Sequence, residues 1–565
     1  MTTVNEYHSE VLAWIEQDPD LETVAELKAL LKASEAGDEQ AQAEISDRFS
    51  TRLSFGTAGL RGAIAAGPNR MNRVVVIQAA AGLARYLLAN AHEGKTPSVV
   101  IGFDGRKNSE VFARDTAEIM SGFGVEAMLM PRMLPTPVLA FSVRALNASA
   151  GVMVTASHNP AADNGYKVYL GGEDHGSQIV SPADADIAEQ IDFVAAHIKV
   201  NELDRGSFSI IAESVIERYI TQTALVVGSF APAPSAQPHF VYTAMHGVGY
   251  ETFAAIISRA GFASPIVVAE QNIPDASFPT VEFPNPEEPG ALDLAYALAR
   301  KTKAELIVAN DPDADRLAVA IPDESTAEGY RRLTGNELGA LLGWRTAREL
   351  GLTNKTRTLA CSIVSSPALS AVAEHYGLDF RWTLTGFKWV SRVENLAFGY
   401  EEALGYLVNP GTIRDKDGIS AAVALLSIVS ELKSQGSTLS DHLDEFSMNF
   451  GHFASEQISL RVSDLSEIPR LMTSLRSSQP AGIGGIAVAT VDDLLAGNSD
   501  FPPSDVLRFW LEDGSRIMVR PSGTEPKLKV YIDVVSREGE LAQRRNDAAQ
   551  RLSALAFGMK ELLGL

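Results

Sequence analysis

The chain contains a serine at a position where an enzyme could use it as a nucleophile. The apolar run Ala150–Val154 predicts a buried strand, and it leads directly into Thr155-Ala156-Ser157-His158-Asn159-Pro160. In an open α/β sheet, ligands bind beyond the carboxyl ends of the strands. Pro160 has no N–H group and restricts the residue before it, so no regular element continues through this segment. We therefore expect Ser157 to lie exposed on a loop, as a turn residue or as a nucleophile.

A second apolar run, Leu306–Asn310, is followed by carboxylates at every second position: Asp311, Asp313 and Asp315. Pro312 favours an extended chain, in which alternate side chains point to one side. Three convergent carboxylates repel one another, and a divalent cation with all-oxygen ligands relieves this repulsion. Such ligands favour Mg²⁺, Mn²⁺ or Ca²⁺ over zinc. The segment therefore predicts a metal site, with a solvated acidic turn as the alternative.

A third segment, residues 519–531, has the components of a phosphate cradle. Gly523 lets the backbone approach a ligand, Ser522 and Thr524 supply hydroxyl groups, and Arg520 and Lys527 supply cations. A plain hairpin turn would account for the glycine and the prolines, but not for this concentration of donors.

In this order, the serine loop, the three aspartates and the cradle resemble the α-D-phosphohexomutase superfamily of phosphoglucomutases and phosphomannomutases. The resemblance begins near Leu53 and covers nearly all of the chain from there. It includes four further motifs: Phe55-Gly56-Thr57-Ala58-Gly59-Leu60-Arg61-Gly62, Gly102-Phe103-Asp104-Gly105-Arg106, Asn164-Gly165-Tyr166-Lys167 and Thr385-Gly386-Phe387-Lys388.

The resemblance implies catalysis through a phosphoserine. Phosphorylated Ser157 would transfer its phosphate to a free hydroxyl of a sugar monophosphate, and the other phosphate of the resulting bisphosphate would return to Ser157. Mg²⁺ would be bound by Asp311, Asp313, Asp315 and a phosphate oxygen on Ser157. Glucose 1,6-bisphosphate would act as intermediate and activator.

The resemblance also implies the residues that move the proton and bind the substrate. Lys167 is the favoured acceptor of the hydroxyl proton, with Arg61 and His158 nearby, although the pKa of a lysine must be lowered for this role. The alternative for Lys167 is a solvated hairpin residue, and for Lys388 an exposed residue at a helix start. The implied substrate-binding residues are Thr57, Arg316, Lys388, Glu402, Arg520, Ser522, Gly523, Thr524 and Lys527.

The sugar is indicated by Tyr400-Glu401-Glu402-Ala403-Leu404-Gly405-Tyr406, which lies where the family carries its sugar-recognition loop. Aligned on Gly405, Glu402 matches the sugar-binding glutamate, and Leu404 stands where the family commonly has serine. The motif at residues 414–418, Arg-Asp-Lys-Asp-Gly, is similar to the branch that includes phosphopentomutases, glucose 1,6-bisphosphate synthases and some bacterial phosphoglucomutases.

We therefore expect a phosphoglucomutase that acts on α-D-glucose 1-phosphate. Phosphopentomutase, phosphomannomutase and glucose 1,6-bisphosphate synthase are the alternatives on the same machinery. A non-catalytic sugar-phosphate sensor is disfavoured, because a sensor has no use for the nucleophile Ser157.

Composition limits the classes of partner and the cellular compartment that we expect. The 565 residues have a formal net charge of −23, which disfavours nucleic acid and anionic membrane surfaces as partners. One cysteine, Cys361, excludes an intrachain disulfide, fits the cytoplasm and follows apolar residues typical of a buried strand. No signal pattern opens the chain, and no apolar run approaches the ~20 residues of a membrane span. We expect a cytoplasmic monomer or homodimer whose partners are small sugar phosphates.

Strand-like runs alternate with helical periodicity, which predicts the α/β class with mainly parallel sheets. We expect three mixed-sheet α/β domains of similar topology and a C-terminal α+β domain around a central cleft. Thr334 and Glu337 form a capping-box pattern, and Asp513-Gly514 a hairpin turn. The predicted segments are a helical extension of surface helices at 1–46, the serine domain at 47–205, the metal domain at 206–325, the sugar-loop domain at 326–450 and the phosphate-loop domain at 451–565.

Overall fold

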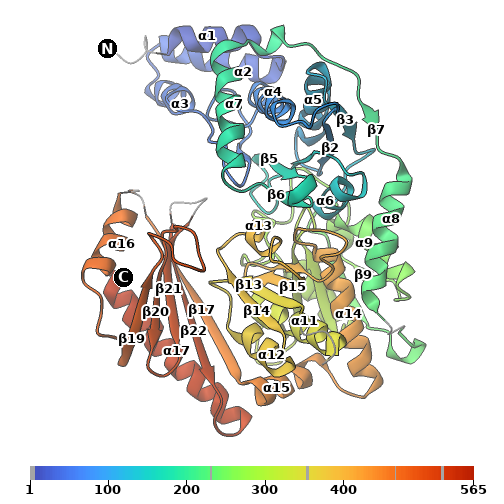
Figure 1. Ribbon diagram of the computed structural model, residues 1–565, viewed down its shortest axis with the longest axis vertical. Helices are drawn as coiled ribbons and strands as arrows, with labels where there is room; N and C mark the ends of the chain where they lie inside the picture. The colour runs from blue at the N-terminus through green and yellow to red at the C-terminus, as the bar shows by residue number, and fades with distance from the viewer. Residues whose placement is uncertain are drawn as a thin grey trace. The chain divides into compact units, whose positions relative to one another are not determined.

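The computed structural model describes residues 7–228, 232–351, 356–462, 464, 466–522 and 527–564, and the chain divides into two compact units (Figure 1). The first unit contains Met1–Arg332 and Gly405–Ser427, and the second contains Leu333–Leu404 and Ile428–Leu565. A short segment that follows the sugar loop therefore returns to the first unit.

Three amphipathic helices open the first unit. They are exposed on one side, as predicted for surface helices, while the other side contributes Val11, Trp14 and Leu27 to the core of the first sheet. Apolar burial of this kind ties the helices to the domain that follows them. They are α1 (His8–Gln17), α2 (Leu21–Glu35) and α3 (Glu39–Phe49).

The first sheet is mixed, with the strand order β1-β5-β4-β2-β3-β7, and β6 pairs with β5. Strands β4, β2, β3 and β7 run parallel to one another, whereas β5 is antiparallel to both β1 and β4. Its strands are β1 (Leu60–Ala63), β2 (Ser98–Phe103), β3 (Glu126–Leu129), β4 (Ala150–Val154), β5 (Asp163–Leu170), β6 (Ser177–Gln178) and β7 (Ser209–Ile210). The helices are α4 (Arg73–Ala89), α5 (Ser109–Gly122), α6 (Thr136–Ala145) and α7 (Ala183–His197).

The second sheet has the order β12-β11-β10-β8-β9. Strand β10 is parallel to β8 and antiparallel to β11, so the segment between β10 and β11 must reverse the chain. The elements are α8 (Glu213–Ala224), β8 (Phe240–Thr243), α9 (Gly249–Arg259), β9 (Ile266–Val267), α10 (Asp293–Thr302), β10 (Leu306–Asn310), β11 (Leu317–Pro322) and β12 (Tyr330–Arg332).

The second unit begins with a smaller α/β region in which β13 runs parallel to both β14 and β15. The predicted capping box is present, because the Thr334 side chain accepts from the Glu337 backbone N–H and the Glu337 side chain accepts from the Thr334 backbone N–H. Cys361 is a buried residue of β13, as predicted. The elements are α11 (Gly335–Leu350), β13 (Thr358–Ser362), α12 (Ala368–Tyr376), β14 (Asp379–Thr383), α13 (Phe387–Val390), β15 (Leu396–Glu401) and α15 (Leu439–Phe450). The returning segment holds β16 (Gly405–Leu407) and the start of α14 (Gly418–Ser434).

The C-terminal sheet is antiparallel throughout, with the order β17-β22-β21-β20-β19-β18. Strands β20 and β21 form the predicted hairpin around Asp513-Gly514. The elements are β17 (His452–Arg461), α16 (Glu467–Ser477), β18 (Gly482–Ile483), β19 (Ile486–Asp493), β20 (Leu507–Leu511), β21 (Arg516–Pro521), β22 (Lys527–Ser536) and α17 (Leu541–Leu563). The predicted fold class, mixed α/β sheets followed by an α+β region, is confirmed. No helix in the described part of the chain is long and apolar enough to cross a membrane.

Candidate active site

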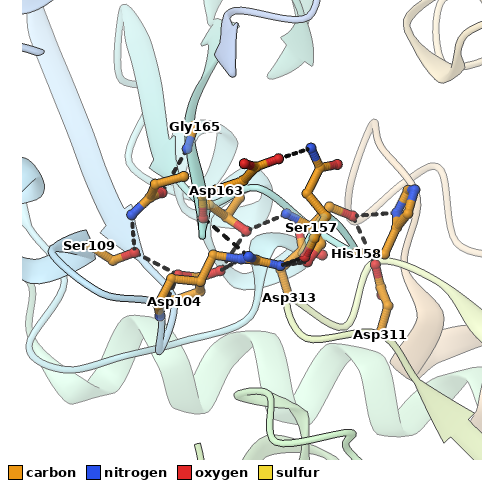
Figure 2. A network of polar contacts seen from close by, with 12 residues as sticks. Asp104, Ser109, Ser157, His158, Asp163, Gly165, Asp311 and Asp313 are labelled. Carbon is orange, nitrogen blue, oxygen red and sulfur yellow. Dashed lines mark hydrogen bonds and ion pairs between the residues drawn. The ribbon is translucent and has the colours of Figure 1, made fainter. Parts of the chain in front are cut away.

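The serine loop follows β4, as predicted, but Ser157 is buried and not exposed. Only 2% of the residue is accessible, because the loop after β10 covers it. The Ser157 hydroxyl donates to Asp311 Oδ2 at 2.9 Å and lies 3.2 Å from His158 Nδ1 (Figure 2). The two motifs singled out first in the sequence are therefore in direct contact within the first unit.

The three aspartates converge as predicted, but the extended geometry expected for them is wrong. The Asp311 carbonyl accepts a hydrogen bond from the Ala314 N–H at 2.9 Å, and Ala314 has a φ of +55°. The segment is thus a tight turn, as the antiparallel return from β10 to β11 requires. All three carboxylates are fully buried, and one oxygen from each lies within 4.8 Å of the others.

Cations surround this acidic cluster. Lys167 Nζ lies 2.7 Å from Asp313 Oδ2 and 3.0 Å from Asp315 Oδ2, and Lys416 Nζ lies 3.3 Å from Asp315 Oδ2. Burial raises the pKa of Asp311 well above its usual range, and the neighbouring carboxylates raise it further. Burial acts the same way on Asp313, but Lys167 outweighs it and lowers the pKa of that carboxyl. Asp311, which Ser157 contacts, is therefore the carboxyl group of this pair whose ionised form is less favoured in the absence of a cation.

The cluster has the donor set of a hard divalent cation. Asp313 Oδ2 already accepts from Lys167 and from the Thr136 hydroxyl, at 2.7 and 2.6 Å. In the described part of the chain, Asp313 Oδ1 and Asp315 Oδ1 are buried and accept no hydrogen bond. Buried carboxylate oxygens without donors are costly, and a bound cation satisfies them. The residues present therefore fit a metal ion such as Mg²⁺.

The proton-transfer candidates differ in charge state. Lys167 is buried in β5, which excludes the solvated-hairpin alternative. Burial alone would lower the pKa of Lys167, but Asp313 and Asp315 outweigh it and raise the pKa. Burial, together with the nearby Arg316 and Arg61, lowers the pKa of His158 well below its ordinary value, so its imidazole is neutral at pH 7. A neutral imidazole can accept a proton, and His158 Nδ1 is in reach of Ser157 Oγ.

Two further predicted residues, Arg61 and Arg316, lie beside this site. Arg61, in β1, donates from Nη1 to Asn159 Oδ1 at 3.2 Å, and Asn159 lies two residues after Ser157. Thr57 lies in the two-residue turn closed by hydrogen bonds between Gly56 and Gly59. Arg316 Nε lies 3.7 Å from Asp315 Oδ1 and 3.9 Å from Asp311 Oδ2.

Lys416 has no role in the sequence analysis, although its motif is noted there. It is 6% exposed, and its neighbours anchor it: Asp415 Oδ2 accepts from the Tyr169 hydroxyl at 2.8 Å, and Asp417 accepts from the Tyr219 hydroxyl at 3.1 Å. The sequence feature that could have indicated a role for Lys416 is its position between two aspartates. The position of Lys416 in the fold depends on the return of Gly405–Ser427 to the first unit, and the local sequence does not predict that return.

The sugar-loop residues lie in the second unit. Glu402 Oε2 accepts from the hydroxyls of Ser362 and Ser365, at 3.0 and 3.2 Å. Its hydrogen bonds from described residues both end on Oε2, so Oε1 can accept from a ligand. Leu404 is fully buried with a φ of +62°. Lys388 is partly buried in α13 rather than exposed.

A buried arginine supports the sugar loop from the C-terminal sheet. Arg516, on β21, pairs with Asp533 of β22 at 2.9 Å and also donates to the Ser365 carbonyl. Its guanidinium lies 4.4 Å from the centre of the Trp382 ring. Ser365 thereby connects the loop that carries Glu402 to the C-terminal region, because its hydroxyl donates to Glu402 and its carbonyl accepts from Arg516.

The predicted phosphate cradle is described in part. Arg520 is the penultimate residue of β21 and Lys527 begins β22, and the Ser522 N–H donates to the Lys527 carbonyl at 2.8 Å. The two strand ends that carry the cations are therefore adjacent. Gly523 and Thr524 lie outside the described residues.

Four domain families match the chain in order. All four are described as Phosphoglucomutase/phosphomannomutase: alpha/beta/alpha domain I over residues 52–196, domain II over 217–324, domain III over 334–449 and the C-terminal domain over 462–550. A solved structure from Paramecium, the phosphoglucomutase pp63/parafusin, has a TM-score of 0.68 at 20% identity and covers 91% of this chain and 97% of its own. This structural likeness shows the shared fold.

Relatives with higher identity carry three different names. The chain is 55% identical to a probable phosphomannomutase of Haemophilus influenzae, over 84% of this chain and 95% of the relative. It is 34% identical to the human phosphopentomutase, over 94% and 92%, and 36% identical to a phosphoglucomutase of Staphylococcus epidermidis, over 90% and 96%. The chain belongs to the phosphoglucomutase/phosphomannomutase family. It is an enzyme of the phosphohexomutase type, a sugar-phosphate mutase.

Proposed function

We propose that this mutase interconverts α-D-glucose 1-phosphate and glucose 6-phosphate through a phosphoserine at Ser157. The observation that carries the proposal is the 2.9 Å contact between the Ser157 hydroxyl and Asp311, inside a cluster of aspartates with unsatisfied oxygens. A serine in this environment is suited to carry a phosphate group whose charge a cation can offset.

In the proposed reaction, an oxygen–phosphorus bond at Ser157 breaks as a sugar hydroxyl forms a new one. The product of this half-reaction is glucose 1,6-bisphosphate. After the bisphosphate reverses its orientation, its other phosphate returns to Ser157 and the isomeric monophosphate leaves. The hydroxyl proton goes to a neighbouring base. Lys167 remains the prediction from the family motif, whereas the neutral imidazole of His158 is the group that can accept a proton in the structure described above.

Asp311, Asp313 and Asp315 would hold Mg²⁺ together with a phosphate oxygen on Ser157. When bound, this ion would offset the charge that develops on the transferring phosphoryl group. Lys167 and Lys416 favour the ionised forms of Asp313 and Asp315, because they pair with carboxylate oxygens of these two residues.

The second unit would supply substrate recognition. Glu402 Oε1 would accept from sugar hydroxyls, while Ser362 and Ser365 hold Oε2. Lys388 would contact the sugar or its phosphate. The phosphate that does not react would be bound by Arg520, Ser522, Gly523, Thr524 and Lys527. Thr57 and Arg316 remain predicted substrate-binding residues of the first unit.

A pentose phosphate is the second candidate substrate. Leu404 places a fully buried apolar side chain where a hexose-specific loop commonly has serine. A site that lacks a hydrogen-bonding partner for a substrate hydroxyl discriminates weakly against a sugar that lacks that hydroxyl. We therefore expect measurable activity on ribose 1-phosphate beside the main activity on glucose 1-phosphate.

The test is a substrate panel under one set of conditions, with Mg²⁺ and a bisphosphate activator. We expect kcat/KM to be highest for glucose 1-phosphate. A tenfold or greater preference for ribose 1-phosphate would replace the proposal with a phosphopentomutase, and a preference for mannose 1-phosphate would overturn our interpretation of the sugar loop. Intact-mass analysis of the active enzyme should show a fraction that carries one phosphate.

A further inference from the structure

Ser157 has a backbone conformation that few residues other than glycine adopt. Its φ is +52°, in the left-handed region. That region costs an L-residue about 1–2 kcal/mol, and such conformations persist only where the surroundings enforce them. The serine loop must therefore be held by its neighbours.

Arg106 holds this loop through four backbone carbonyls. Its Nη2 lies 2.5 Å from the Ser157 carbonyl oxygen and 2.8 Å from that of Asn159. Its Nη1 lies 2.8 Å from the Pro160 carbonyl oxygen and 3.2 Å from that of Asp163. The side chain is fully buried, so water does not compete for these charge-assisted bonds. A forked guanidinium can serve four acceptors at once, whereas a lysine ammonium has three hydrogens on one nitrogen.

Asp104 holds the other side of the same residue. Its Oδ2 accepts from the Thr155 hydroxyl at 2.6 Å, and the oxygen of that hydroxyl accepts from the Ser157 N–H at 2.9 Å. Its Oδ1 accepts from the Ser109 hydroxyl at 2.7 Å and from the Arg106 N–H at 3.0 Å, as Figure 2 shows in part. The amide and the carbonyl of Ser157 are thus both tied to the segment between β2 and α5.

The second sheet's domain closes over the guanidinium. The Phe278 ring centre lies 5.0 Å from Arg106 Cζ, a cation–π distance. A Cβ atom on Gly105 would lie 2.8 Å from Pro274 Cβ, so the two segments are in close contact there. Arg106 is enclosed by the serine loop on one side and by this loop on the other.

We propose that Asp104 and Arg106 are positioning residues that orient Ser157 for phosphoryl transfer. The inference rests on the proposed function, in which Ser157 carries the phosphate. The two residues fix the backbone of Ser157 so that its hydroxyl points at Asp311. Within the described part of the chain, neither of them hydrogen-bonds to Asp311, Asp313 or Asp315. Their loss should therefore lower kcat and leave KM and Mg²⁺ affinity unchanged.

The main test is Arg106→Lys, which keeps the charge and removes the fork. A displacement of the nucleophile of about 1 Å costs about 10²-fold in rate, so we expect kcat to fall about 10²-fold. KM and the Mg²⁺ affinity from calorimetry should match the wild type. Arg114→Lys, at a half-exposed arginine of α5, is the matched control and should behave as wild type. An unchanged kcat in Arg106→Lys, or equal losses in kcat, KM and Mg²⁺ affinity, would overturn the proposal.

A second variant decides the matter if Arg106→Lys does not fold. Thr155→Val keeps the shape of the side chain and removes the hydroxyl between Asp104 and the Ser157 N–H. Loss of one such hydrogen bond corresponds to a decrease of about 10-fold in rate. We expect kcat to fall about 10-fold with KM unchanged, and an unchanged kcat would overturn the proposal. Ser157→Ala separates the two ideas: if it is inactive while Arg106→Lys is fully active, only this inference fails, whereas full activity in Ser157→Ala refutes the proposed function itself.

Discussion

The serine loop and the sugar loop are each held by a buried arginine, but the two arginines differ in origin. Arg106 lies two residues from its partner Asp104 and donates to four carbonyls of the serine loop in the same domain. Arg516 comes from the C-terminal sheet and donates to one carbonyl, that of Ser365, whose hydroxyl bonds to Glu402.

The difference separates chemistry from recognition. The group proposed to react is fixed by a dense network within the first unit. The group proposed to recognise the sugar depends on contacts between two regions of the second unit, where Val364 and Leu384 pack with Met518 and Tyr531. Changes in the C-terminal sheet should therefore alter specificity before they alter the chemical step.

The largest expected effect is at Ser157. Ser157→Ala should lower turnover by at least about 10⁴-fold, because the proposed nucleophile is removed. Loss of the hydroxyl leaves Asp311 without that donor and should lower the free energy of unfolding by about 1 kcal/mol. The measurements are kcat, the phosphorylated fraction by intact mass, and Tm. Ser427→Ala, which removes a buried hydroxyl of α14, should lose a similar amount of stability and keep full activity. Near-normal turnover in Ser157→Ala would rule out a phosphoserine mechanism.

The next effect is at the aspartate cluster. Asp313→Asn keeps the shape but removes one charge, so Mg²⁺ affinity should weaken and kcat should fall about 10²-fold. EDTA should abolish wild-type activity, and added Mg²⁺ should restore it. Calorimetric titration with Mg²⁺ tests binding separately from turnover, with Asp323→Asn, in an exposed turn of the same domain, as the control. Full activity of the metal-free enzyme would exclude this cluster as the metal site.

A smaller and more selective effect is expected at Glu402. Glu402→Gln should reduce kcat/KM for glucose 1-phosphate about 10- to 100-fold, because hydrogen bonds to a charged group contribute about 1.5–3 kcal/mol. The loss for ribose 1-phosphate should be smaller, and inhibition by inorganic phosphate should not change. Glu401→Gln, at the neighbouring glutamate, is the matched variant for the loss of one charge. Equal losses for both sugars would show that Glu402 does not read the sugar.

The smallest effect is expected at Arg516, which contacts the loop that carries Glu402 through Ser365. Arg516→Lys keeps a charge for Asp533 but reduces the donors to Ser365, so the glucose-to-ribose ratio of kcat/KM should fall by about 3- to 10-fold. The phosphorylated fraction of Ser157 should stay at the wild-type level. Arg508→Lys, on β20 and paired with Asp492, is the control for a change in the same sheet. A fall in kcat equal to that of Arg106→Lys would erase the contrast between the two regions.

Features that depend on neighbours within a few residues could be predicted from the sequence. The capping box at Thr334, the hairpin at Asp513-Gly514 and the buried strand that carries Cys361 all follow from local propensity and pattern. The placement of a serine after β4 and of three aspartates after β10 is local in the same sense. The proposed mechanism rests on family motifs, because residue types and spacing alone left a turn serine and a solvated acidic turn as open alternatives.

The burial and conformation of these groups were decided by segments far apart in the chain. Ser157 is buried because the loop after β10 covers it, and Ala314 turns the aspartate segment although Pro312 favours extension. The N–H group of Thr136, at the start of α6, donates to the Asp313 carbonyl, and that of Val248, just before α9, donates to the Pro312 carbonyl, and together they fix that turn. Lys416 reaches Asp315 only because its segment returns to the first unit. Local propensity is a property of adjacent residues, whereas tertiary packing determines which distant residues become partners. The same packing brings in the charged groups that shift the pKa of each site residue.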